Sequence, residues 1–182
     1  YTAITGGGKN ALFAENIVSN HMRKLNDGGA FYFFAGDGLR VTRNRVYGSG
    51  GPLCHAYYLD ERSKNCVVED NVAIDAGSCF QGHMAKDCVF RHNLIMDNGE
   101  VEVAMARCEN FTFDRNDIVA KGFVAFKMPQ GAIGDMPNNI FHGERTVVRW
   151  LDDYAIQNEE PFELRDGSTG RPTRIQEIPS GG

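Results

Sequence analysis

The sequence predicts an all-β fold made of stacked repeats, and three observations lead to this prediction. An apolar residue, two further residues and an asparagine recur at intervals of about 22 to 28 residues, a period typical of repeat architectures. Other apolar residues keep fixed distances from each asparagine. Asparagine also tolerates left-handed turns, and its amide can bond to the asparagine of the next repeat. The fold class predicted is a single-stranded right-handed parallel β-helix of about six rungs. The repeated asparagines are Asn16, Asn44, Asn71, Asn93 and Asn116, with a degraded copy at Asn139.

The apolar positions predict which residues stack in the core. One expected inward column holds Phe31, Tyr58, Phe80, Val103 and Phe126, with rungs ~4.8 Å apart. A second column places Cys66 beside Cys88 as buried, unbonded thiols. The main rival at this period, a leucine-rich repeat, needs an L-x-x-L-x-L consensus that the sequence lacks.

Length and charge narrow the class of protein. A chain of 182 residues can form one domain with a sizeable core. Its formal net charge is −5 and it has no basic stripe, which argues against a nucleic-acid partner. No apolar run approaches the ~20 residues of a membrane span. The sequence leaves the oligomeric state open.

The repeat defines two regions, a β-helix over residues 1–143 and a C-terminal cap over residues 144–182. The apolar residues from Val147 to Tyr154 have a helical spacing, although an irregular strand fits them equally well. Trp150 is expected to plug the end of the solenoid. Because the chain starts within a rung and lacks an initiator Met, we expect a β-helix truncated at its N-terminal side, with any export signal upstream.

Two short segments carry a family resemblance. Asp27-Gly-Gly-Ala-Phe-Tyr32 resembles the DGGA-[IV]-Y signature of carbohydrate-active right-handed β-helix proteins, and Ala56–Glu61 with Ser63 and Asn65 resembles their G-I-Y-L-D-[DE]-G-S segment. Arg62 stands where glycine is usual. Over roughly residues 10–120 the chain is similar to proteins of the glycoside hydrolase family 141 type. The resemblance implies a polysaccharide or oligosaccharide partner and an extracellular or periplasmic location.

Paired carboxyl groups are the chemistry that glycoside cleavage usually requires, one protonated and one ionised. The catalytic candidates are Asp60 and Glu61 at the end of a strand, with Asp27 as a second carboxylate. Along a straight strand Asp27 would lie ~20 Å from Asp60, so only a sharp turn would bring them together. A role in forming a turn would explain Asp27 equally well. Ion pairs with Arg62 or Lys64 in a solvated turn would likewise explain Asp60 and Glu61.

The expected outer face of the sheet supplies candidates for substrate contacts. Tyr32, Leu59, Gln81 and Lys127 fall in one outward column, and His83 falls one rung above Glu61. A purely structural role would explain His83 as well. The residues expected to bind substrate are His83, Tyr32, Tyr58, His55 and Lys127.

Three functions fit these residues. The leading one is a glycoside hydrolase acting on a plant or bacterial polysaccharide. The first alternative is a polysaccharide lyase acting on uronic acids, which would depend on Lys127, Arg107 and His83. The second is a non-catalytic carbohydrate-binding or structural solenoid. No cofactor is expected, although stacked Asp75 and Asp97 make a calcium ion a candidate ligand.

Overall fold

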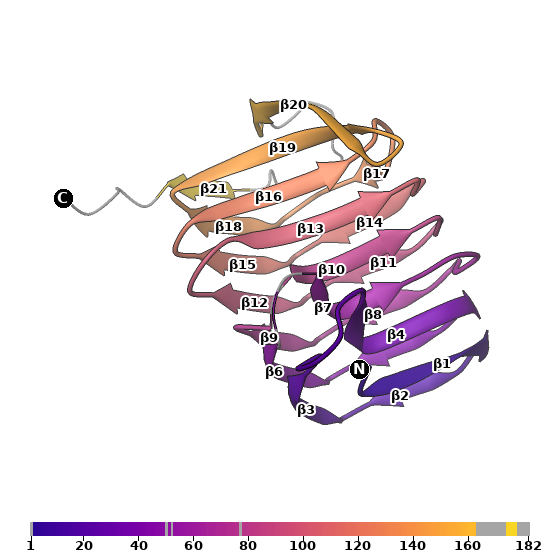
Figure 1. Cartoon of the computed structure of the whole chain (residues 1–182). Helices are drawn as coiled ribbons and strands as arrows, with labels where there is room; N and C mark the ends of the chain where they lie inside the picture. Colours follow the sequence, from indigo (N-terminus) through magenta and orange to yellow (C-terminus); the bar gives the residue numbers. More distant parts are fainter. Residues whose placement is uncertain (1, 50, 52, 77, 163–173, 178–182) are drawn as a thin grey trace.

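The computed structural model describes residues 2–49, 51, 53–76, 78–162 and 174–177, and it is a coil of short β-strands stacked into three sheets (Figure 1). Sheet A contains β1 (Ile4–Lys9), β4 (Gly28–Asp37), β7 (Cys54–Leu59), β10 (Ser78–His83), β13 (Val101–Ala106), β16 (Phe123–Met128), β19 (Arg145–Asp152) and β20 (Ala155–Pro161). Sheet B contains β2 (Leu12–Ala14), β5 (Arg40–Thr42), β8 (Val67–Glu69), β11 (Val89–Arg91), β14 (Phe111–Asp114) and β17 (Ile133–Asp135). Sheet C contains β3 (Ile17–His21), β6 (Arg45–Ser49), β9 (Val72–Ile74), β12 (Leu94–Asp97), β15 (Asp117–Ala120), β18 (Ile140–Gly143) and β21 (Arg174–Glu177).

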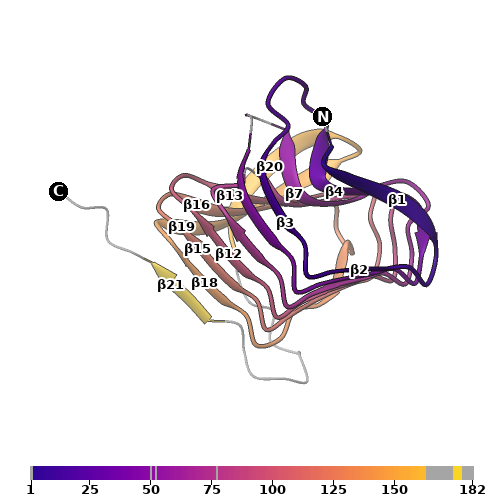
Figure 2. The ribbon, with the colours of Figure 1, turned by 90° about the horizontal axis from the view of Figure 1, so that it is seen from below.

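Apart from one strand, each strand of the described chain pairs in parallel with the equivalent strand of a neighbouring rung, so the predicted parallel solenoid is confirmed. Viewed along its axis, the coil encloses a core between the three sheets (Figure 2). The exception is β20, which runs antiparallel to β19. The described part of the chain contains no helix long and apolar enough to cross a membrane.

The asparagine ladder is present and continuous from Asn16 to Asn139. The backbone N–H and the side-chain amide of Asn44 both donate to Oδ1 of Asn71, at 2.9 and 3.0 Å. The same amide also donates to the carbonyl of Phe13 in the preceding rung, at 2.9 Å. The left-handed residue of each turn is the one before the asparagine, such as Arg43 with a φ of 53°. The asparagine therefore stabilises the corner through its side chain, and its neighbour supplies the backbone turn that we had assigned to the asparagine.

The inward aromatic column differs from the prediction by one residue in the third rung. Tyr57 pairs in register with both Phe31 and Phe80, whereas Tyr58 pairs with Tyr32 and Gln81 on the outer face. Leu59, predicted to face solvent, is buried at 1% exposure. Phe80 pairs in turn with Val103, so the remainder of the column is as predicted.

An extra residue in one turn causes this shift. Lys64 and Lys86 occupy equivalent positions in their rungs, and the path from Tyr57 to Lys64 is one residue longer than the path from Phe80 to Lys86. The additional length forms the turn after β7. Within it Arg62 has a φ of 65°, a conformation that favours glycine, which explains why the related segments carry glycine at this position.

The described part of the C-terminal region folds as strands, and residues 163–173 and 178–182 of the predicted cap lie outside the described residues. Residues 145–161 form the hairpin β19–β20, which settles the choice between helix and strand in favour of strand. Trp150 packs partly against the core and donates from Nε1 to Glu160 Oε2 at 3.2 Å. The five cysteines are buried and unbonded, as predicted for Cys66 and Cys88.

We expect Asn93→Ala to lower the free energy of unfolding by ~3 kcal/mol or more, because it removes the Oδ1 that accepts from the backbone N–H and the side-chain amide of Asn71, and the amide that donates to the carbonyl of Val68 and to Oδ1 of Asn116. Denaturant unfolding measures the effect. Asn158→Ala is the matched control, since the Asn158 amide bonds to Glu160 on an exposed strand and its loss should change stability by less than ~0.5 kcal/mol. Equal effects of the two substitutions would show that the ladder is not a main source of stability.

Candidate functional site

The candidate site is at the end of sheet A where β7 and β10 finish. Asp60 directly follows β7, and its backbone N–H donates to the carbonyl of Phe33 at 2.8 Å, which fixes the residue against β4. Its carboxylate accepts three hydrogen bonds, from the Tyr32 hydroxyl at 2.5 Å, from Nδ1 of His83 at 2.7 Å and from the backbone N–H of Glu61 at 2.8 Å. Both carboxylate oxygens are therefore occupied as acceptors.

His83, the last residue of β10, is held between Asp60 and a tyrosine from the C-terminal hairpin. An ionised carboxylate can only accept, so Nδ1 of His83 carries the proton donated to Asp60. In the neutral imidazole, Nε2 is then an acceptor, and the hydroxyl of Tyr154 lies 2.8 Å from it. The result is a chain of hydrogen bonds from Tyr154 through His83 to Asp60.

Arg107 adds a positive charge beside this chain. It follows β13, and its guanidinium carbon lies 4.6 Å from the centre of the Tyr154 ring. Its Nε and Nη2 donate to Asp153, the latter at 2.9 Å. The hydrogen bond with Asp153 is the main cause of a raised Arg107 pKa, and the charge of Glu61 contributes less. Arg107 therefore stays charged and keeps the hairpin turn in place over the site.

The other predicted contact residues lie on the outer face of sheet A. The ring of Tyr58 meets that of Tyr32 edge-on at 5.0 Å, and the ring of His55 packs on Tyr58 at 5.3 Å. Tyr58 is 6% exposed and His55 4% exposed, so both offer little surface to a ligand. Lys127 shares their outward column three rungs from Tyr58, about 14 Å away at ~4.8 Å per rung.

Asp27 lies outside this site. Its backbone N–H donates to the carbonyl of Leu53, at the start of β7, whereas Asp60 follows the end of the same strand. The separation is about 20 Å at ~3.3 Å per residue, too far for a hydrolytic pair. The expected closeness of Asp27 to Asp60 is therefore wrong, because the turn before β4 does not fold back along the strand.

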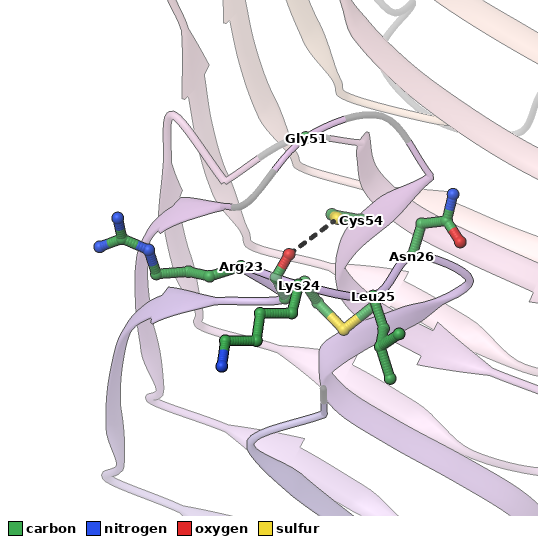
Figure 3. Close-up of a pocket in the computed structure, with 7 residues that line it drawn as sticks. Arg23, Lys24, Leu25, Asn26, Gly51 and Cys54 are labelled. Carbon is green, nitrogen blue, oxygen red and sulfur yellow. Dashed lines mark hydrogen bonds between the residues drawn. The ribbon is translucent and has the colours of Figure 1, made fainter.

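A hollow of about 250 Å³ is present near Asp27, at the other end of the strands (Figure 3). The thiol of Cys54 donates to the carbonyl of Met22 at 3.8 Å on one side of the hollow. Its described lining includes two cations and no carboxylate or imidazole: Met22, Arg23, Lys24, Leu25, Asn26, Gly51 and Cys54.

Two places could hold a cation. Ligand atoms of Asp60, Glu61 and His83 lie within 4.8 Å of one another, which is the chemistry of a divalent metal site once the His83–Asp60 proton is lost. Asp75 and Asp97 lie in adjacent rungs, as expected, and burial followed by the charge of Asp75 raises the pKa of Asp97. There the amide of Asn98 bonds to Asp75, and the backbone N–H of Gly99 bonds to Asp97. A calcium ion at the second place stays a prediction.

Fold and site together define a β-solenoid with a polar, hydrogen-bonded corner. A family model described as the right-handed β-helix region matches residues 1–118, and the chain belongs to this family. The fold is common in carbohydrate-active enzymes. Searches of curated proteins and of solved structures gave no match. The narrower resemblance to glycoside hydrolase family 141 stays a prediction.

Some residues of this site were predicted from the sequence to lie together, and others were not predicted. Tyr32, Asp60, Glu61 and His83 cluster as expected, although His83 pairs with Asp60, because the extra residue of the turn displaces Glu61. Tyr154 was not predicted. Its only signal in the sequence was an aromatic residue after two aspartates, a common turn pattern.

We expect the protein to lose stability as the pH falls from about 6.5 to about 4, and His55 to account for part of the loss. Burial lowers the pKa of His55 from 6.5 to about 4, with smaller contributions from His21 and Lys127. In this pH range the unfolded chain binds a proton that the folded chain does not, which favours unfolding by at most ~3 kcal/mol.

The test measures the free energy of unfolding at pH 7 and pH 5 for His55→Phe and for the control His142→Phe on sheet C. The first substitution should reduce the pH dependence and the second should preserve it. An unchanged slope in His55→Phe would contradict the prediction.

Proposed function

We propose that the chain acts on an acidic polysaccharide by β-elimination, with Tyr154, His83 and Asp60 as its acid–base groups. The observation that carries the proposal is the chain of hydrogen bonds from the Tyr154 hydroxyl to Nε2 of His83 and from Nδ1 of His83 to Asp60. A buried carboxylate at Nδ1 stabilises the imidazolium that forms when His83 takes the phenolic proton.

In this reaction Tyr154 acts as both base and acid. Its phenolate, with the proton held by His83, removes the hydrogen from C5 of a uronic acid residue. The electron pair forms the C4–C5 double bond, the C4–O bond breaks, and the same phenol protonates the departing oxygen. Groups of this kind typically contribute 10²- to 10⁴-fold to a rate, and here the phenol is within reach of ligand because Tyr154 is 51% exposed.

Arg107 supports an acidic substrate. Abstraction of the C5 hydrogen is helped when a cation neutralises the adjacent carboxylate, since the charge developing on that group is stabilised. The bonds to Asp153 use Nε and Nη2 of Arg107, which leaves Nη1 for a ligand beside Tyr154. Lys127, further along the same outer face, would contact a neighbouring acidic sugar.

Hydrolysis is the second candidate, and the closeness of Asp60 to Glu61 favours it. Their carboxylate oxygens lie within 4.8 Å, near the spacing of a retaining pair. Asp60 is less suited to act as acid or nucleophile, because three donors occupy its oxygens. In this mechanism Glu61 would be the acid, whereas in elimination it is not required.

The two mechanisms can be separated by product and by substitution. On a panel of polyuronates we expect new near-ultraviolet absorbance from an unsaturated product. Tyr154→Phe and His83→Gln should each lower kcat about 10²- to 10⁴-fold, because they remove the proton-transfer groups. Glu61→Gln should leave kcat almost unchanged.

Tyr47→Phe on sheet C is the matched control, and thermal melting of each variant checks its fold. Reducing ends without new absorbance, together with loss of activity in Glu61→Gln, would replace elimination by hydrolysis. No activity of either kind on neutral or acidic polysaccharides would favour the non-catalytic alternative.

A further inference from the structure

The outer face of sheet C carries two apolar columns that the candidate site does not use. The strand register from β3 to β18 aligns Ser19, Tyr47, Ile74, Met96, Val119 and His142 in one column, which is apolar from β6 to β15. In the other column, two charges interrupt an otherwise apolar series. Listed from β3 to β18, that column contains Ile17, Arg45, Val72, Leu94, Asp117 and Ile140.

These side chains are accessible. Ile17 is 72% exposed, Met96 40% and Leu94 37%, and they are among the most exposed large apolar residues of the described chain. The equivalent outer positions of sheet B differ, because Glu69 there forms ion pairs with Arg40 and Arg91. A contiguous apolar face of this kind marks an interaction surface.

The two charges on this face lack partners within the described chain. The side chains of Arg45 and Asp117 take part in no hydrogen bond or ion pair there, although other arginines of the described chain pair with acids. They occupy β6 and β15, which flank the adjacent strands β9 and β12 in a seven-stranded sheet that β21 extends beyond β18. Arg45 and Asp117 are therefore equally far from the boundary between β9 and β12.

We propose that this face binds a second copy of the chain in a two-fold dimer. A two-fold axis parallel to the strands, between β9 and β12, places β6 of one copy opposite β15 of the other. Arg45 then faces Asp117 of the second copy, twice per dimer. The same axis sets Val72 opposite Leu94, Ile74 opposite Met96 and Ile17 opposite Ile140, so each apolar side chain meets another.

The geometry of packed sheets fits this arrangement. Two sheets pack face to face at ~10 Å, a gap that an arginine and an aspartate together can span. The six rungs from β3 to β18 extend about 24 Å along the solenoid at ~4.8 Å per rung. Two columns of side chains over that length would bury only a modest area between the two copies. An interface of this size is typical of a reversible dimer.

The test is sedimentation of the full chain over a range of concentrations. We expect a concentration-dependent dimer that Met96→Lys abolishes. Leu12→Lys is the matched control, because Leu12 is 63% exposed on sheet B, and it should leave the dimer intact.

Charge substitutions test the two-fold register itself. Arg45→Asp should raise the dimer dissociation constant about tenfold or more, because two aspartates then face each other. The double variant Arg45→Asp/Asp117→Arg should restore it. Since all these positions face outward, melting temperatures should stay close to that of the parent protein.

Three results would overturn the proposal. A monomer at every concentration would mean that another partner covers the face. A dimer that survives Met96→Lys would lie elsewhere on the molecule. A charge-swapped variant as weak as the single variant would exclude the two-fold register.

Discussion

The side-chain amide of a buried asparagine is the interaction on which the stacking of this molecule depends. From Asn44 to Asn116, each amide donates to the asparagine of the next rung and to a carbonyl of the previous one, as Asn93 does to Asn116 and Val68. A corner between two sheets interrupts the regular pairing of strands, and backbone groups left there in the core would lack partners. The ladder supplies those partners at the same place in every rung, so the sheets stay in register.

The candidate site forms where one turn departs from this regularity. The turn after β7 is one residue longer than the corresponding turn of the next rung. Tyr57 therefore stays in the core column, and Asp60 lies at the corner of the outer face. There its carboxylate meets Tyr32 from the previous rung and His83 from the next. Regular stacking brings Tyr32 and His83 to this corner, and the longer turn places the Asp60 carboxylate between them.

The periodic part of the fold could be predicted from the sequence, because like residues recur at like positions. The ladder from Asn16 to Asn139, the parallel sheets and the clustering of Tyr32, Asp60, Glu61 and His83 follow from that recurrence, although it placed His83 beside Glu61 and not Asp60. The displacement of Tyr58 could not be predicted, because counting back from the asparagine assumes turns of equal length. The contact of Tyr154 with His83 could not be predicted either. An antiparallel hairpin outside the repeat forms this contact, and no periodic pattern of residues encodes it.

The contact between Tyr154 and His83 joins residues 71 positions apart, whereas rungs are typically joined by contacts over some 22 to 28 residues. A solenoid can begin to assemble at any rung and extend to its neighbours. The corner, in contrast, is complete only after β13, β16 and β19 have all joined the stack above β10. Its assembly is therefore a late event, and loosening of any of the three intervening strands would separate the phenol from the imidazole while the rest of the coil remained wound.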